Sequence, residues 1–249
     1  TVRRIILGGV DVRVTGEGWE TVGEFRTDGR RMAPGDLPAL DLLRKAAAVA
    51  NTAAIERHNG EMRVVGDPTD AALVVLSAKA GSDRRSLDQE YRVLDDLPFS
   101  SLRRFRAALV ERLPAVGGKE RWVFAVGAPD VILARSSSVA GAALESLSLD
   151  EAAIERIERS NVAMAGEVLR VLAVAVRRED GGRDALAESD VEGLMFLGLV
   201  GMSDPPRKGV AEAVVRCRRA GIRIVMITGD HADTAMAVAR EIGLIGPGE

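Results

Sequence analysis

The chain has 249 residues, of which 47% are hydrophobic and 29% charged, and its formal net charge is −3. Its length allows one large domain or two ordinary ones. The composition is typical of a globular protein with a sizeable core and excludes a disordered or fibrous chain. The slight negative charge argues against a general nucleic-acid binder and against a binder of anionic membranes.

Several other classes are also excluded. The longest uncharged apolar-rich stretch, at 193–202, is about half of the roughly 20 residues that a helix needs to cross a bilayer. Cys217 has no partner for an internal disulfide, and His58 and His231 lie too far apart in sequence for metal-site spacing, so we expect no bound metal and a reducing compartment. No signal-peptide pattern and no initiator Met open the chain at Thr1, so we expect a fragment.

The first third of the chain predicts a hairpin and then a helix. Two β-prone runs within 2–18 flank Gly8 and Gly9, which is the pattern of a β-hairpin. After a polar, proline-containing connection, residues 39–55 are rich in Ala and Leu, which are strong helix formers. We therefore expect a helix over 39–55.

A second helix is marked at both ends within 66–81. Asp67 is suited to cap it, Pro68 suits its first position, and Gly81 suits its end. Asp70 falls near the third helical position, where a carboxylate can also serve as a cap.

From about residue 91 the sequence changes to short β-prone runs. Those at 91–100, 105–113 and 121–127 are separated by turn-like segments and indicate an antiparallel sheet. After a helical segment at 148–167, the run at 168–178 predicts one more strand of that sheet.

The last sixty residues have a different pattern. The nearly continuous apolar runs at 193–202 and 222–227 are typical of strands buried on both faces. A helix between them makes the two strands a parallel pair, and a second helix follows, ended by Gly243. This βαβα segment is expected in a doubly wound sheet. The pattern of apolar residues changes near Asp204, which suggests a domain boundary there, with domains at 1–203 and 204–249.

Thr228, Gly229 and Asp230 follow the second of these predicted strands. Ligands of open parallel sheets collect beyond the carboxyl ends of strands. A Thr hydroxyl and N–H groups opened by Gly229, beside a helix N-terminus, can cradle a phosphoryl group, and Asp230 can orient the loop or water around Mg²⁺. From these residues alone, simple capping of the following helix is an equal alternative.

Five segments together carry a resemblance. They are LGLVGMSDPPRKGVAEAVVRCRRAGIRIVMITGDHADTAMAVAREIGL at 197–244, GDPTDAAL at 66–73, LPFSSLRR at 97–104, VGAPDVIL at 126–133 and GEVLRVLAVA at 166–175. In this order they resemble P-type cation-transporting ATPases, especially the calcium and sodium-potassium pump group. The resemblance implies an α+β nucleotide-binding domain, an antiparallel sheet with flanking helices, followed by a partial α/β phosphorylation domain like that of haloacid dehalogenases.

The resemblance also implies a nucleotide site. It places Phe99 under the adenine ring, where the residues alone favour a core Phe beside a proline, and it makes Asp70 an acceptor for the adenine amino group instead of a helix cap. Arg170 matches a residue that reaches the phosphates or ribose. Arg104 stands where a Lys is usual, with a solvated surface charge as the alternative. Gly127 and Ala128 belong to the matching Gly-Ala-Pro motif.

Three positions depart from the family pattern. Val126 stands where a Lys usually precedes the Gly-Ala-Pro motif, and Arg106 and Ala107 replace the usual Met-Ser. A cation normally deep in the adenine pocket is therefore absent, and Arg106 is the candidate to return some of that charge. The hypothesis is that nucleotide binding is weaker or posed differently, which ATP titration of a Val126→Lys variant tests.

The phosphorylation-domain part is expected to be incomplete. Residues 204–207 match the hinge between the domains, and Thr228, Gly229 and Asp230 match the phosphate-side loop. The Asp-Lys-Thr-Gly-Thr motif with the nucleophilic Asp is not in the chain, and covalent phosphoryl transfer depends on that carboxylate and on a metal held in line. The fragment is expected to bind nucleotide without turnover.

In the intact pump the resemblance implies ATP with Mg²⁺ as cofactors. It also implies as partners the remaining phosphorylation domain, the actuator domain and the transmembrane domain, but no nucleic acid. The chain would then be a cytoplasmic domain of an integral membrane protein that moves a cation, with Ca²⁺ favoured by the subgroup. Two alternatives remain open: a haloacid-dehalogenase-type hydrolase with a large cap, and a stand-alone regulatory nucleotide-binding module.

Overall fold

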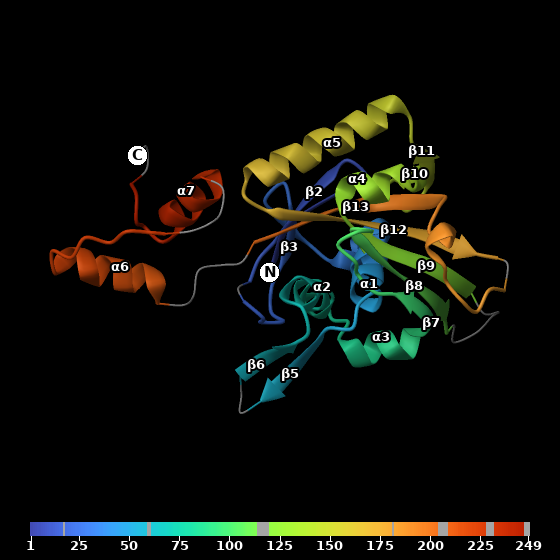
Figure 1. The fold of residues 1–249 in the computed structure, drawn as a ribbon, viewed down its shortest axis with the longest axis horizontal. Helices are drawn as coiled ribbons and strands as arrows, with labels where there is room; N and C mark the ends of the chain where they lie inside the picture. The colour runs from blue at the N-terminus through green and yellow to red at the C-terminus, as the bar shows by residue number, and fades with distance from the viewer. Residues whose placement is uncertain are drawn as a thin grey trace.

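The computed structural model describes residues 1–16, 18–58, 61–113, 120–180, 182–203, 209–227 and 232–246. Its main feature is a large sheet with the strand order β4-β3-β2-β1-β13-β12-β9-β8-β7, to which β10 and β11 are joined through β13 (Figure 1). The strands of this sheet are β1 (Val2–Leu7), β2 (Val10–Val14), β3 (Phe25–Thr27), β4 (Arg30–Met32), β7 (Tyr91–Leu97), β8 (Phe105–Arg112), β9 (Glu120–Gly127), β10 (Ser136–Ala140), β11 (Ser146–Ser148), β12 (Arg170–Glu179) and β13 (Leu194–Met202). A separate two-stranded ribbon consists of β5 (Ala54–His58) and β6 (Glu61–Val65).

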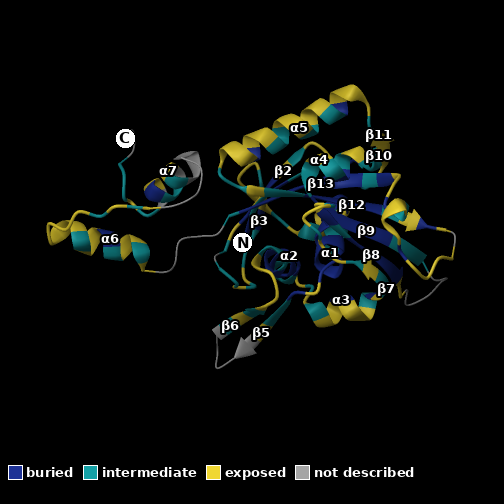
Figure 2. Ribbon diagram, in the orientation of Figure 1, coloured by how far each residue is buried: buried dark blue, intermediate teal, exposed yellow. Residues whose placement is uncertain are grey.

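Helices cover both faces of the sheet. They are α1 (Pro38–Val49), α2 (Pro68–Lys79) and α3 (Arg84–Glu90) on one face and α4 (Pro129–Ala134) and α5 (Glu151–Gly166) on the other, with α6 (Val210–Arg219) and α7 (Ala232–Glu241) near the C-terminus (Figure 1). Short 3₁₀ turns occur at Pro34–Asp36 and Glu188–Asp190. The sheet residues between the helix layers are mostly buried, and the outer sides of the helices are exposed (Figure 2). The domain is therefore a sheet-rich α+β fold.

Strand β8 contributes side chains to the hydrophobic cores on both faces of the sheet. Phe105, Ala107 and Leu109 pack with residues of α4 and α5, and Ala108 and Val110 pack with residues of α1 and α2. Successive side chains of a strand point to opposite faces of the sheet. The alternation directs Arg106 toward the face covered by α1 and α2.

The predicted hairpin and antiparallel sheet are confirmed. β1 and β2 pair antiparallel, and Gly8 and Gly9 between them have φ values of +51° and +78°, in the region that glycine adopts readily. β7 pairs with β8, β8 with β9 and β9 with β12, all antiparallel. The two helices predicted within 204–246 are also present, as α6 and α7.

The helix predicted over 39–55 is too long. α1 ends at Val49, and β5 begins at Ala54. Asn51 ends the helix, because its side-chain amide donates to the Ala47 carbonyl at 2.9 Å and its side-chain oxygen accepts from the Ala53 N–H at 3.0 Å. A polar side chain that satisfies backbone groups locally competes with continuation of the helix.

The predicted parallel pair of strands is wrong. Residues 194–202 form β13, but residues 222–227 form no strand, and Ile227 is 92% exposed. β13 pairs antiparallel with β12 along one edge, and along the other it pairs antiparallel with β1 and parallel with β10. Since both edges of β13 are occupied, residues 222–227 have no strand to pair with there. The doubly wound sheet predicted for this segment is not what the described residues show.

Candidate functional site

Four strand ends meet at one edge of the large sheet. β7 and β9 end there, and β8 and β12 begin there, because neighbouring strands run antiparallel. The register pairs Gly127 at the end of β9 with Phe105 on β8 and with Ala173 on β12. This arrangement places five of the sequence-predicted positions at the same edge: Phe99, Arg104, Gly127, Ala128 and Arg170.

Gly127 permits the close approach of β8 and β9 at this edge. A Cβ atom at this position would overlap the Cβ of Phe105 and would lie 2.6 Å from the carbonyl oxygen of Arg104. The same carbonyl accepts the N–H of Ala128 at 2.9 Å. Residues of the predicted Gly-Ala-Pro motif therefore hold the end of β9 against the start of β8.

The loop between β7 and β8 presents an aromatic ring to solvent. Phe99 is 57% exposed. The Arg104 N–H donates to the Ser100 carbonyl at 2.7 Å, and the Arg103 guanidinium donates to the Pro98 carbonyl at 2.7 Å. These two hydrogen bonds hold the residues on either side of Phe99 in the loop. Phe99 is therefore not the core residue that its sequence context alone suggests, and its ring is free to stack on a planar ligand.

The first turn of α2 is capped by Asp67. The Asp67 carboxylate accepts the N–H of Thr69 at 2.7 Å and that of Asp70 at 3.4 Å. Burial alone would raise the pKa of Asp67, but these N–H groups and the nearby Arg170 hold it below its usual value. Since Asp67 is the cap, the Asp70 side chain is released from the capping role that the sequence left open.

Asp70 instead forms an ion pair with Arg106. The Nη1 of Arg106 donates to the Oδ2 of Asp70, and the side chains are only 12% and 19% exposed, respectively. Burial raises the pKa of the Asp70 carboxyl, and the Arg106 charge offsets part of that rise. Arg106 lies opposite Val126 in the β8–β9 register. The cation on β8 therefore lies beside the position where the sequence lacks the expected lysine.

A second arginine reaches the same turn of α2 from β12. The Nη1 of Arg170 donates to the hydroxyl oxygen of Thr69 at 2.9 Å. The first turn of α2 thus contacts guanidinium groups from two strands, at Asp70 and at Thr69. Such groups have the geometry to bind phosphate oxygens. The sequence predicted Arg170 and Asp70 as site residues, but it gave no sign of the direct Arg106–Asp70 contact.

Arg104 is directed elsewhere. Its guanidinium pairs with the Asp130 carboxylate at the start of α4, and both side chains are largely exposed. Its backbone has a φ of +58°, which is uncommon outside glycine. The backbone of Arg104 therefore lies at the edge where the strand ends meet, but its guanidinium pairs with Asp130 and not with Asp70.

Thr228, Gly229 and Asp230 lie outside the described residues, as does the expected hinge at 204–207. Among the helices that the structure does describe, none combines the length and apolarity needed to cross a bilayer.

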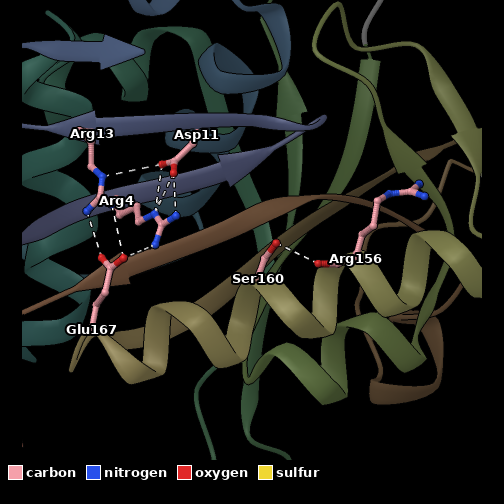
Figure 3. A network of polar contacts seen from close by, with 6 residues as sticks. All are labelled: Arg4, Asp11, Arg13, Arg156, Ser160 and Glu167. Atoms are coloured by element: carbon pink, nitrogen blue, oxygen red, sulfur yellow. Dashed lines mark hydrogen bonds and ion pairs between the residues drawn. The ribbon is translucent and has the colours of Figure 1, made fainter. Parts of the chain in front are cut away.

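A second charged cluster lies on the opposite face, between the β1–β2 hairpin and the end of α5 (Figure 3). The Arg4 guanidinium binds Asp11 at 2.6 Å and Glu167 at 2.6 Å, and Arg13 binds Glu167 at 3.0 Å. We refer to these four residues as the Arg4 network. An open groove of about 670 Å³ lies between this hairpin, β13 and α5. Sequence reasoning missed the network, since Arg4 and Glu167 are 163 residues apart.

The fold and the edge together define a sheet-rich α+β domain consistent with nucleotide binding. The family model described as "P-type ATPase, cytoplasmic domain N" matches residues 39–209, which is more than half of the chain. The chain belongs to the P-type cation-transporting ATPases.

Known relatives agree with this assignment. The chain is 35% identical to a Calcium-transporting ATPase of Bacillus subtilis over 98% of its own length and 27% of the relative's. It is 35% identical to the Cation-transporting ATPase pma1 of Synechocystis, over 100% of the chain and 27% of the relative. It is also 35% identical to Calcium-transporting ATPase 2, plasma membrane-type, of Arabidopsis thaliana, over 77% of the chain and 18% of the relative. The chain therefore spans about a quarter of the length of the first two relatives.

Proposed function

We propose that this chain binds ATP at the edge formed by the loop after β7, the ends of β8, β9 and β12, and the first turn of α2. The observation that supports the proposal is that two arginines, Arg106 and Arg170, contact the same helical turn, while the exposed ring of Phe99 lies in the loop that joins β7 to β8. Phe99 stacks on the adenine ring, Asp70 accepts from its amino group, and Arg170 binds the phosphates or ribose. Arg104 adds positive charge to the site when its exposed ion pair with Asp130 opens, and Gly127 and Ala128 form part of the surface of the site.

In the intact protein this domain presents ATP to a phosphorylation domain of which residues 204–249 are a part, with residues 1–203 as the nucleotide-binding domain. Thr228, Gly229 and Asp230 then form the phosphate-side loop there, together with a nucleophilic Asp outside this sequence and with Mg²⁺. The whole protein is a membrane pump that couples ATP hydrolysis to cation transport, with actuator and transmembrane domains as partners of this cytoplasmic part. Two of the relatives named above are calcium-transporting ATPases, so Ca²⁺ is the favoured ion. The chain alone binds nucleotide without turnover.

Titration of the chain with ATP, followed by backbone amide NMR, tests the site. We expect the largest shifts around Asp70, Phe99, Gly127 and Arg170, with the remote Arg4 network unchanged. Shifts confined to residues 228–230 would contradict the assignment.

Replacement of Phe99 by Ala tests the stacking role directly. Stacking of a base on an aromatic ring contributes about 1–3 kcal/mol, so ATP affinity should fall about 5- to 150-fold. Because the ring is 57% exposed, the thermal stability of the chain should barely change. Leu102→Ala is the matched control, since Leu102 lies in the same loop and is 92% exposed. Equal affinities for the two variants would remove Phe99 from the site.

A further inference from the structure

The Arg106–Asp70 pair has unused hydrogen-bonding capacity at the proposed nucleotide site. A guanidinium carries five N–H donors, and a carboxylate has about four acceptor positions. Within the described residues, the side-chain hydrogen bond between the two residues uses only Nη1 of Arg106 and Oδ2 of Asp70. The Nε of Arg106 is buried and has no partner among the described residues. A ligand cannot reach that enclosed nitrogen, but among the described residues Nη2 of Arg106 and Oδ1 of Asp70 form no side-chain hydrogen bond, so the pair offers one donor and one acceptor.

The fold fixes this donor and acceptor relative to each other. Arg106 projects from β8, which lies between β9 and the edge strand β7, and Asp70 projects from a helical turn that Asp67 caps. The low exposure of both side chains limits competition from water. Phe99, the proposed stacking residue, follows β7, which is the strand next to β8. The loop that carries Phe99 leads into β8, of which Arg106 is the second residue, so the proposed stacking residue and the Arg106–Asp70 pair belong to the same end of the sheet.

A cationic donor beside an anionic acceptor is complementary to more than one purine edge. Adenine presents its amino donor beside a ring-nitrogen acceptor, and guanine presents its O6 acceptor beside N–H donors. Arginine is a favoured partner of the guanine O6, and a carboxylate accepts from amino and N–H groups. A carboxylate accepts from the amino group of adenine and also from the N–H groups of guanine, so it does not by itself choose between them. The added guanidinium supplies the donor that guanine O6 requires.

We propose that Arg106 and Asp70 together read the purine edge, and that Arg106 makes this site accept guanine nucleotides as well as adenine nucleotides. This inference rests on the proposed function, because it concerns the same site. Arg106 is then a specificity-determining residue, and its removal changes the ratio of the two affinities.

The first experiment uses the unmodified 249-residue chain. Calorimetric titrations with ATP, GTP and the triphosphate of purine riboside, which has no group at position 6, give three dissociation constants. We expect the dissociation constants for ATP and GTP to agree within about tenfold. The purine riboside triphosphate should bind more weakly than both, because a site whose polar groups are left unpaired rejects an analogue that lacks their partner. A GTP affinity at least a hundredfold below that for ATP would overturn the inference.

The second experiment measures the same constants for Arg106→Met and for Arg4→Met, which removes an arginine from the opposite face. Arg106→Met should raise the ratio of the GTP to the ATP dissociation constant at least tenfold, and Arg4→Met should leave it unchanged. An unchanged ratio in Arg106→Met would overturn the inference while ATP binding still supports the proposed function. Absence of binding by either nucleotide to the unmodified chain would overturn both. Should Arg106→Met fail to fold, the first experiment decides alone.

Discussion

Two arginine–carboxylate clusters join helices to the sheet, one on each face, and they differ in how completely their hydrogen bonds are used. In the Arg4 network every nitrogen of the Arg4 guanidinium donates to a carboxylate, and the Asp11 and Glu167 side chains remain 45% and 41% exposed. In the Arg106–Asp70 pair a single carboxylate meets the guanidinium, and the Nε of Arg106 is buried without a partner among the described residues.

This difference agrees with a structural role for the Arg4 network and with the proposed binding role of the Arg106–Asp70 pair. A network whose donors are all used, and whose carboxylates stay hydrated, has little left to offer a ligand. A pair of low exposure that keeps an unused donor and acceptor carries a desolvation penalty, and a ligand that pairs with those groups can reduce it. The proposed site therefore differs from the Arg4 network in the hydrogen-bonding capacity that is left for a ligand, since both carry charge.

The largest effect on stability is expected for Arg106→Met. Removal of one partner from a buried ion pair costs about 3–5 kcal/mol, and the residual exposure of Arg106 and Asp70 places this variant near the lower end. The double variant Arg106→Met/Asp70→Asn should recover much of that loss, because no unpaired charge stays buried. Chemical denaturation measures both free energies of unfolding. A double variant as unstable as the single one would show that packing, not charge, dominates at this pair.

A smaller effect is expected for Arg4→Met. The Asp11 and Glu167 carboxylates that it leaves behind are well exposed, so the loss in unfolding free energy should be about 1 kcal/mol or less. Because salt screens exposed charges, the difference between the unmodified chain and Arg4→Met should shrink as salt is added. Denaturation at low and high salt checks this. A loss as large as that of Arg106→Met would break the contrast between the two clusters.

The smallest effect is the pH dependence that Asp70 contributes. Burial outweighs the attraction of Arg106, and nearby Asp67 adds repulsion, so the pKa of Asp70 is raised above its ordinary value of 3.8. The folded state then binds a proton more tightly than the unfolded state, so this contribution to stability is fully present below pH 3.8 and is lost as the pH rises through the raised pKa. Denaturation of the unmodified chain and of Asp70→Asn across this range should give curves that diverge in that direction. Parallel curves would show that Asp70 titrates normally.

Local patterns in the sequence predicted much of the fold. The hairpin around Gly8 and Gly9 and the cap of α2 at Asp67 depend on neighbouring residues, and both are present. The predicted end of α1 was wrong. The Ala-rich composition of residues 39–55 favoured a longer helix, whereas the single residue Asn51 ends it.

The candidate site was predicted in its members but not in its contacts. Phe99, Asp70 and Arg170 were assigned through the resemblance, and the fold brings their segments to one edge. The pairing of Arg106 with Asp70 joins residues 36 positions apart, and no local pattern indicates it. Whether these residues bind ATP stays a prediction for the titrations described above.

Local preferences for strand, helix or turn can be read from the sequence, since they arise from side chains a few residues apart. Which apolar run forms a strand depends instead on contacts between distant parts of the chain. Residues 194–202 found partners on both edges, whereas residues 222–227 remain without a strand partner among the described residues. The physical reason is that a buried strand must satisfy its backbone N–H and C=O groups through neighbours, and those neighbours come from distant parts of the chain.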